Sequence, residues 1–243
     1  MKRNLTILLF FLFIYTALLG CTSQNLTSLN EYIPRPTNYN KHIKVKIIPK
    51  QNQETGKTLS IEETIDQTID VFEKRLNPKG KKKVLIQKEG EDIIKISIPE
   101  DTDVEKIKEL IQYVGKLEFK EQDVKTNSWK TVLTGDSLKP NSANVNLDQY
   151  GSPYISIEFT PEGAKLFGEI TKRNLKKHIG IYFDKKEISS PIVASAILNG
   201  ICQISCYNMP LEECEKIAVL INSGYLNADI QILDNTNDKK EKK

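Results

Sequence analysis

The sequence contains few of the side chains that carry most enzyme chemistry. Its two histidines, His42 and His178, lie in well-separated segments, and the patterns H-E-x-x-H, G-x-S-x-G, G-x-G-x-x-G and the P-loop do not occur. Zinc-ligand spacing is also missing, because Cys202 and Cys206 form C-x-x-x-C with no histidine within twenty residues. We therefore expect no catalytic residues, no cofactor and no metal site, and hence no enzyme.

The sequence also lacks a marked excess of charge of one sign. Removal of Lys2 and Arg3 with a leader takes the basic count from 35 to 33, against 32 acidic residues. A mature chain with a net charge of about +1 gives no support to nucleic-acid binding or to a polybasic membrane contact. Hydrophobic residues make up 39% of the chain, which is enough for a packed core in one or two domains.

Only one long apolar run is present, at the N-terminus. Lys2 and Arg3 form a short basic start, and residues 5–19 are almost wholly apolar. Fifteen residues at about 1.5 Å each reach roughly 22 Å, short of the ~30 Å hydrocarbon core, so we expect residues 1–20 to be a signal peptide. Later apolar stretches are no longer than a strand.

The apolar run ends at a lone cysteine. Leu18, Leu19, Gly20 and Cys21 resemble the bacterial lipobox, which implies cleavage before Cys21 and diacylglyceryl and palmitate attachment at that residue. The alternative is a plain signal peptide with an incidental cysteine. With the lipid, the mature protein would be anchored to the cell membrane on its extracytoplasmic face, or to the outer membrane if the cell has one.

Hydrophobic periodicity divides the rest of the chain. Residues 21–41 read as a linker, and residues 42–122 follow the order β-α-β-β-α-β of a ferredoxin-like base. Ser60 and Glu63 form a capping box before the first helix, and the turn 89–92 joins two alternating strands. We place the closing strand of this base at residues 116–122, KLEFKEQ.

The second half combines strands with two helices and forms the head, residues 123–225. Residues 123–151 are rich in turn formers, after which Thr160 and Pro161 begin a helix. We expect Leu175 to face inward on this helix, His178 to occupy its last turn and Gly180 to end it. Residues 226–233 are assigned to a final strand that returns to the base, and residues 234–243 to a disordered charged tail.

Three cysteines remain after Cys21. Cys202 and Cys206 fall on the inward face of a short strand, and Cys214 falls on the apolar stripe of the following helix. Burial as small hydrophobic residues is one interpretation, and a disulfide between Cys214 and one strand cysteine is the other.

Six blocks follow one another along the chain: VFEKRLNPKG, IQKEGEDIIKISIPE, ELIQYVGKLEFK, VLTGDSLK, ISIEFTPEGAKLFGEITKRNLKKHIGIYFDKKEISSPIV and PLEECEKIAVLINSG. In this order they resemble the first large extracytoplasmic domain of the SecD subunit of the protein-export machinery. The resemblance implies an α+β fold, with a ferredoxin-like base subdomain and an inserted, mobile α+β head subdomain that grasps emerging polypeptide. It also implies the membrane export machinery as a partner.

This sequence departs from the family at several points. Family members continue into membrane helices that couple proton flow to movement of the domain, whereas this chain ends soon after residue 233. Residues 204–208 replace the family's glycine-rich stretch, and residues 224–227 replace its small, proline-containing helix exit.

Two functional hypotheses follow from the resemblance and these departures. In one, the chain is a lipid-anchored module that binds unfolded or emerging exported polypeptide and assists export or folding. In the other, it is an envelope structural or interaction lipoprotein that contacts a membrane partner. For polypeptide binding we select an exposed edge because Pro191 interrupts strand pairing. The selected residues are Ile188, Ser189, Ser190, Pro191 and Ile192.

Overall fold

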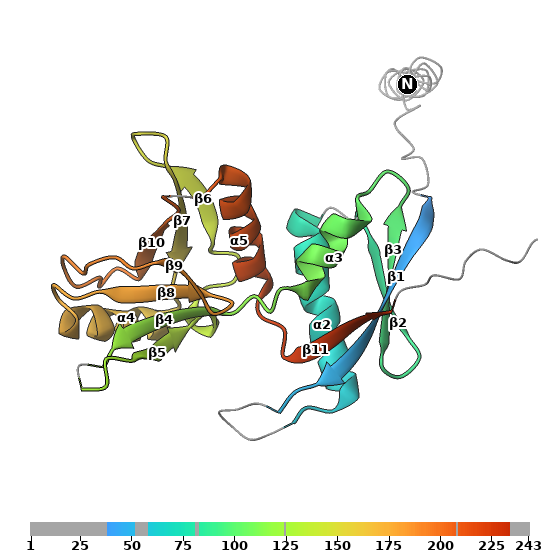
Figure 1. Cartoon of the computed structure of the whole chain (residues 1–243), viewed down its shortest axis with the longest axis horizontal. Coiled ribbons are helices and arrows are strands. Elements are labelled where there is room, and N and C mark those ends of the chain that lie inside the picture. The colour runs from blue at the N-terminus through green and yellow to red at the C-terminus, as the bar shows by residue number, and fades with distance from the viewer. Residues whose placement is uncertain (1–37, 52–57, 81–82, 124, 208, 234–243) are drawn as a thin grey trace, which may run out of the picture. The chain divides into compact units, whose positions relative to one another are not determined.

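The computed structural model describes residues 38–51, 58–80, 83–123, 125–207 and 209–233. The expected signal peptide, the lipidation site Cys21, most of the linker and the charged tail lie outside these residues. The described residues from Tyr39 onward contain two hydrophobic cores, one in a part that we call the base and one in a part that we call the head (Figure 1).

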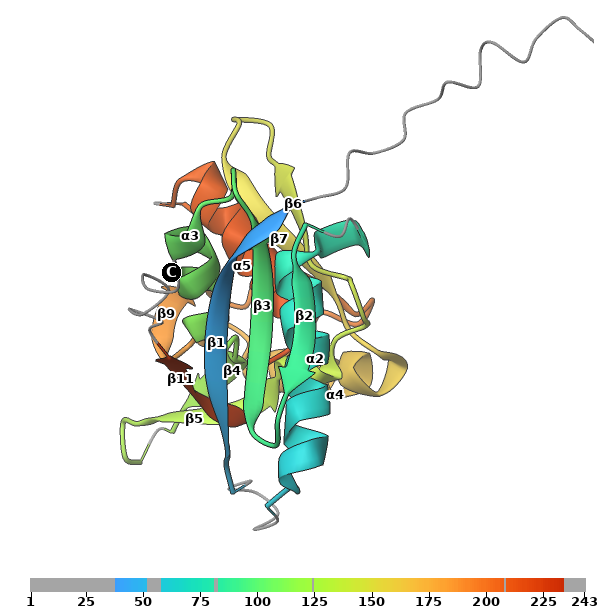
Figure 2. The same cartoon turned by 90° about the vertical axis from the view of Figure 1, so that its right-hand side faces the viewer.

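The base is a four-stranded antiparallel sheet with two helices on one face. Its elements are β1 (Tyr39–Pro49), α2 (Ile61–Leu76), β2 (Leu85–Glu89), β3 (Ile93–Pro99), α3 (Val104–Gln112) and β11 (Ala228–Leu233), with a short 3-10 turn η1 (Pro78–Gly80) after α2. The strand order is β11-β1-β3-β2 (Figure 2). This is the order of a ferredoxin-like fold, which confirms the predicted fold class.

Local sequence explains most of the base. Ser60 Oγ accepts from the Glu63 N–H, and the Glu63 carboxylate accepts from the Ser60 N–H, so the predicted capping box begins α2. Gly90 has a positive φ of 74° in the hairpin between β2 and β3. Inward residues of these elements, such as Phe72 and Ile96, are fully buried.

The predicted closing strand of the base was wrong. Residues Leu117–Gln122 form β4, which pairs with strands of the head, while β11 pairs antiparallel with β1 and completes the base sheet. The physical reason is core membership, because Leu117 and Phe119 are buried in the head core. The whole head is therefore inserted between α3 and β11.

The head contains two antiparallel sheets and two helices. Its strands are β4 (Leu117–Gln122), β5 (Trp129–Thr134), β6 (Asn144–Leu147), β7 (Pro153–Glu158), β8 (Ile179–Phe183), β9 (Lys186–Ser189) and β10 (Ile201–Ser205). The helices are α4 (Pro161–Arg173), α5 (Leu211–Ser223) and the short 3-10 turn η2 (Gly135–Ser137). The strand orders are β5-β4-β8-β9 and β10-β7-β6, so β9 and β10 each end a sheet.

The predicted C-terminus of α4 was also wrong. Asn174 follows the last helical residue, and its Nδ2 donates to the Ile170 carbonyl at 2.9 Å. Leu175 is 45% exposed, and Gly180 lies inside β8 rather than at a helix end. His178 lies beyond the helix, where its Nδ1–H donates to the Ser190 carbonyl.

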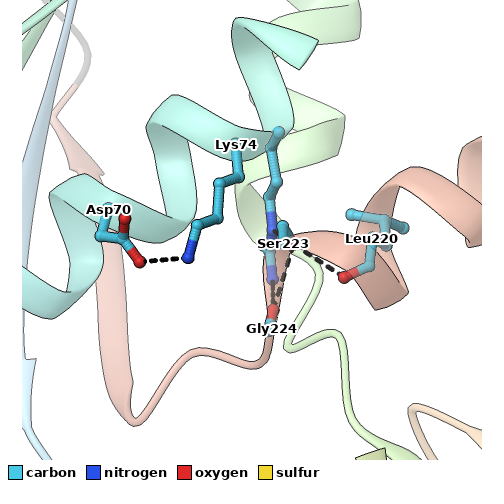
Figure 3. Close-up of polar contacts among 6 residues, drawn as sticks. Asp70, Lys74, Leu220, Ser223 and Gly224 are labelled. Atoms are coloured by element: carbon cyan, nitrogen blue, oxygen red, sulfur yellow. Dashed lines mark hydrogen bonds and ion pairs between the residues drawn. The ribbon is translucent and has the colours of Figure 1, made fainter. Parts of the chain in front are cut away.

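Arg75 of α2 contacts both chain segments that connect base and head. It is 1% exposed, and its guanidinium donates to carbonyl oxygens on both segments and to Ser223 Oγ. The carbonyls belong to Leu110, Tyr113, Val114 and Gly224. Ser223 Oγ in turn donates to the Leu220 carbonyl at the end of α5 (Figure 3).

Glycine is required beside this guanidinium. Gly115 has a φ of 84°, and a Cβ at this position would lie 2.6 Å from Arg75 Nη2. Burial lowers the pKa of Arg75 to about 10, and nearby Asp184 opposes this shift, so the side chain stays charged at neutral pH. Arg75 is thus a buried cation that links α2 of the base to the two chain segments leading to and from the head.

Candidate functional site

The candidate site lies on the head, where the segment after β8 faces β10. β9 follows β8 through a two-residue turn, Asp184 and Lys185, whose φ values are 47° and 70°. Such positive φ values suit a tight hairpin. β9 has one neighbouring strand, β8, and β10 has one neighbouring strand, β7, among the described residues.

A cavity of about 550 Å³ lies between these two sheet edges, and we call it the edge pocket. One wall is β9, and the other is the end of β10 with the segment that leads into α5. Its lining residues are Lys186, Glu187, Ile188, Ser189, Ser205, Cys206, Tyr207, Met209, Pro210 and Glu213. Tyr207 is 78% exposed, so this wall presents an aromatic ring to solvent.

A second cavity of about 330 Å³ lies at the other end of the same two segments, and we call it the apolar pocket. It is lined by Phe167, Thr171, Ile179, Ile181, Pro191, Ile192, Val193, Ala194, Ser195, Ile197, Ile201, Cys202 and Gln203. Most of these side chains are aliphatic or aromatic. Ile192 and Ile201 are 59% and 46% exposed, so apolar surface is open to a ligand here.

The five residues selected from the sequence fall on the border of both pockets. Ile188 and Ser189 end β9 and line the edge pocket, whereas Pro191 and Ile192 line the apolar pocket. Between them, the Ser190 carbonyl accepts from His178 Nδ1 at 2.7 Å. Pro191 lies after the end of β9, and its carbonyl accepts from the Ile179 N–H, so this proline is anchored to the start of β8.

The opposite wall was not selected from the sequence. Gln203 and Ser205 on β10 line the two pockets, with Gln203 at the apolar pocket and Ser205 at the edge pocket. Alternation in the segment GICQIS predicted the strand, and in the structure exposed and buried side chains alternate from Ile201 to Ser205. Local alternation holds no signal for which strand ends a sheet, so the edge position was not predictable.

A disulfide fixes the end of this wall. Cys206, directly after β10, is bonded to Cys214 in the first turn of α5, with 6.4 Å between their Cα atoms. Of the two alternatives left open by the sequence, the disulfide holds for this pair, and burial as a free thiol holds for Cys202. Burial raises the pKa of the Cys202 thiol to about 12, which makes it unreactive.

A third cavity, of about 680 Å³, lies between α2 and α3 on one side and α5 on the other. Ion pairs cross it, Lys216 Nζ to Glu109 Oε1 at 2.9 Å and Lys106 Nζ to Glu212 Oε1 at 3.5 Å. These pairs link the base to the head, so we assign this cavity to the junction and not to a ligand.

The described residues contain no group of three or more histidine, cysteine, aspartate or glutamate side chains that could hold a metal ion. No helix among them is long and apolar enough to cross a membrane. The candidate site offers charged and polar side chains at the edge pocket and mainly apolar side chains at the apolar pocket.

Comparison with known proteins gives consistent matches. Residues 111–228 match the family model of the SecDF P1 head subdomain, and residues 65–124 match the model of the N-terminal part of the P1 domain of the protein translocase subunit SecDF. The protein translocase subunit SecD of Dictyoglomus turgidum is 34% identical over 185 residues, covering 76% of this chain and 44% of the relative. That of Acidaminococcus fermentans is 32% identical over 185 residues, covering 76% and 42%.

Two solved structures share the fold. A structure of SecDF, described as a membrane component that enhances protein export, has a TM-score of 0.66 at 23% identity and covers 80% of this chain and 98% of that chain. SecDF in its super-membrane-facing form has a TM-score of 0.65 at 24% identity and covers 79% of this chain and 29% of that chain.

The fold and the two family models define a base-and-head domain of the P1 type. This chain belongs to the SecD family through that P1 domain, which confirms the resemblance found in the sequence. It spans less than half the length of the curated relatives described above. Those relatives are named as translocase subunits and not as enzymes.

Proposed function

We propose that this protein binds unfolded polypeptide through its head and assists protein export or folding outside the membrane, without enzymatic turnover. The observation that carries the proposal is the pair of pockets that border β10, one facing β9 and one facing residues 191–197, with apolar side chains exposed beside the open edge of β10. Two pockets along one strand suit an extended chain, whereas a fixed folded partner is typically held by a compact flat patch.

Exposed apolar side chains near the hollows support the same function. Ile192, Leu198 and Ile201 are 59%, 76% and 46% exposed. Ile192 and Ile201 line the apolar pocket together, which favours contact with apolar segments of a client chain. Because a holder must release its client, we expect micromolar or weaker affinity, which corresponds to a binding free energy of about −8 kcal/mol or less favourable.

We also propose that Cys21 carries a lipid that anchors the protein on the extracytoplasmic face, close to the membrane export machinery. The support is the apolar run that ends in Leu-Leu-Gly-Cys. In the variant Cys21→Ser, we expect the precursor to stay uncleaved at this site and to show no incorporation of labelled palmitate. If Cys21→Ser still incorporates palmitate and is processed like the unmodified chain, the lipid anchor is wrong.

Crosslinking in intact cells tests polypeptide binding. A photoreactive residue is placed at Ile192 in the apolar pocket, and the matched control is placed at the exposed Lys88 on β2 of the base. We expect Ile192 to capture a mixture of exported proteins and Lys88 to capture far fewer. A single folded protein captured in fixed stoichiometry from Ile192 would instead establish the envelope interaction lipoprotein.

A further inference from the structure

We propose that the head binds a client segment as an added β-strand that pairs with the open edge of β10. This inference rests on the proposed function, since it specifies how an extended chain is held and which part of the chain is recognised. The ligand class is an extended polypeptide recognised through its main chain, with apolar side chains at alternate positions.

The hydrogen bonds between β10 and β7 show which main-chain groups are free. The Phe159 N–H donates to the Gly200 carbonyl at 2.9 Å, and the Cys206 N–H donates to the Pro153 carbonyl at 3.2 Å. Bonded positions alternate along an antiparallel pair. Gly200, Cys202, Ile204 and Cys206 therefore bond to β7, so Ile201, Gln203 and Ser205 direct their N–H and C=O groups to the opposite side.

One of the outward N–H groups of β10 is already bonded within the chain. The Ile201 N–H donates to Asn199 Oδ1 at 3.1 Å, so a side-chain oxygen occupies the first donor position. The next two outward donors belong to Gln203 and Ser205, and no strand among the described residues pairs with them. These donors repeat every second residue, which is the repeat of an extended chain. A helical ligand cannot use them, because its own main-chain groups are bonded internally.

The surroundings of this edge suit a strand as occupant. β10 borders the apolar pocket at Gln203 and the edge pocket at Ser205, so a strand paired with its open edge would run from one pocket toward the other. Ile192 and Ile201 line the apolar pocket, where they can contact apolar side chains of the added strand. The bond between Cys206 and Cys214 anchors the end of β10 to α5, so the edge is held in place before a ligand arrives.

A series of peptides, each with one main-chain N–H blocked by N-methylation, tests the strand pairing. The probe is a short fluorescein-labelled peptide in which isoleucine and serine alternate between terminal lysines. The protein is the full-length chain, kept in detergent. Single N-methyl groups are then moved along the peptide one residue at a time. We expect affinity to fall about tenfold at every second position and to change little at the positions between, because only alternate N–H groups face β10.

Two variants test the protein side. Gln203→Pro removes an outward N–H without removing a bond to β7, as is tolerated on an edge strand, and Gln203→Ala keeps this N–H. We expect Gln203→Pro to weaken peptide binding about tenfold and Gln203→Ala to change it less than twofold, with unchanged circular dichroism and melting temperature in both. If Gln203→Pro lowers the melting temperature, Ser205→Pro, which also lacks a bond to β7, replaces it.

The outcomes separate this inference from the proposed function. An unmodified peptide that does not bind overturns both. Binding that weakens equally at all N-methyl positions, or that is unaffected by the proline variants, overturns strand pairing and leaves polypeptide binding intact. A stable dimer of this chain that dissociates in Gln203→Pro would show that a second copy occupies the edge, which also overturns the inference.

Discussion

Replacement of Arg75 by methionine tests the junction between base and head. The substitution keeps much of the side-chain volume and removes the guanidinium, leaving the carbonyls of Leu110, Tyr113, Val114 and Gly224 without these donors. A buried polar group that loses its partner costs about 1–3 kcal/mol. Because water can reach some of the four carbonyls in the variant, we expect a loss of about 3–5 kcal/mol of unfolding free energy.

Urea unfolding measures this loss with two signals. Trp129, the single tryptophan of the chain, lies on β5 of the head, so its fluorescence follows the head, whereas far-ultraviolet circular dichroism follows both parts. The matched control is Arg173→Met on α4, whose side chain is 49% exposed and pairs with Glu121. We expect this control to lose less than about 1 kcal/mol. A loss below about 1 kcal/mol for Arg75→Met would refute the assigned role of Arg75.

Three further substitutions test individual contacts. Ser60→Ala removes the N-cap of α2, and we expect urea unfolding to show a loss of about 1 kcal/mol. Cys206→Ser combined with Cys214→Ser opens a bridge with a sequence separation of 8, and the chain-entropy relation gives a loss of about 2–3 kcal/mol; an unchanged urea midpoint would count against the bridge. The raised pKa of Cys202 makes stability fall by up to about 1.4 kcal/mol per pH unit from pH 9 to about 12, because the unfolded thiol ionises there and the folded one does not. Cys202→Ala should lack this contribution, so the stability difference between the unmodified protein and the variant should fall as the pH rises from 9 to about 12; a difference that stays constant over this range would contradict the assignment.

Elements defined by local signals were predicted from the sequence. The first helix of the base was found because Ser60 and Glu63 mark its start and its apolar residues recur at helical spacing. The hairpin around Gly90 was found because two alternating segments flank a glycine turn. In both cases neighbouring residues determine the structure, so no tertiary information was needed.

Elements defined by distant contacts were not predictable in the same way. Alternation in Leu117–Gln122 shows that one face is buried, but not which core buries it, and the nearest complete pattern placed this strand in the base. Residues 226–233 were predicted to return to the base, and β11 at Ala228–Leu233 does pair with β1, but the closing position in the sheet had been given to the earlier strand. Long-range pairing of this kind leaves no signature within either strand.

The candidate site shows the same limit. Pro191 was selected because proline interrupts strand pairing, and in the structure it lies after the end of β9 and lines the apolar pocket. The opposite wall at Gln203 and Ser205 became visible only when the sheet order placed β10 at an edge. The choice between Cys202 and Cys206 as partner of Cys214 likewise depended on where α5 begins relative to β10.

The central claim is that the head distinguishes unfolded from folded polypeptide. It is tested most directly by titrating the full chain, in detergent, with one exported protein held unfolded by reduction of its disulfides and with the same protein in its oxidised, folded form. We expect saturable binding of the unfolded form with a micromolar or weaker Kd, and no binding of the folded form at the same concentrations. Equal binding of the two forms, or no binding of either, would contradict the account.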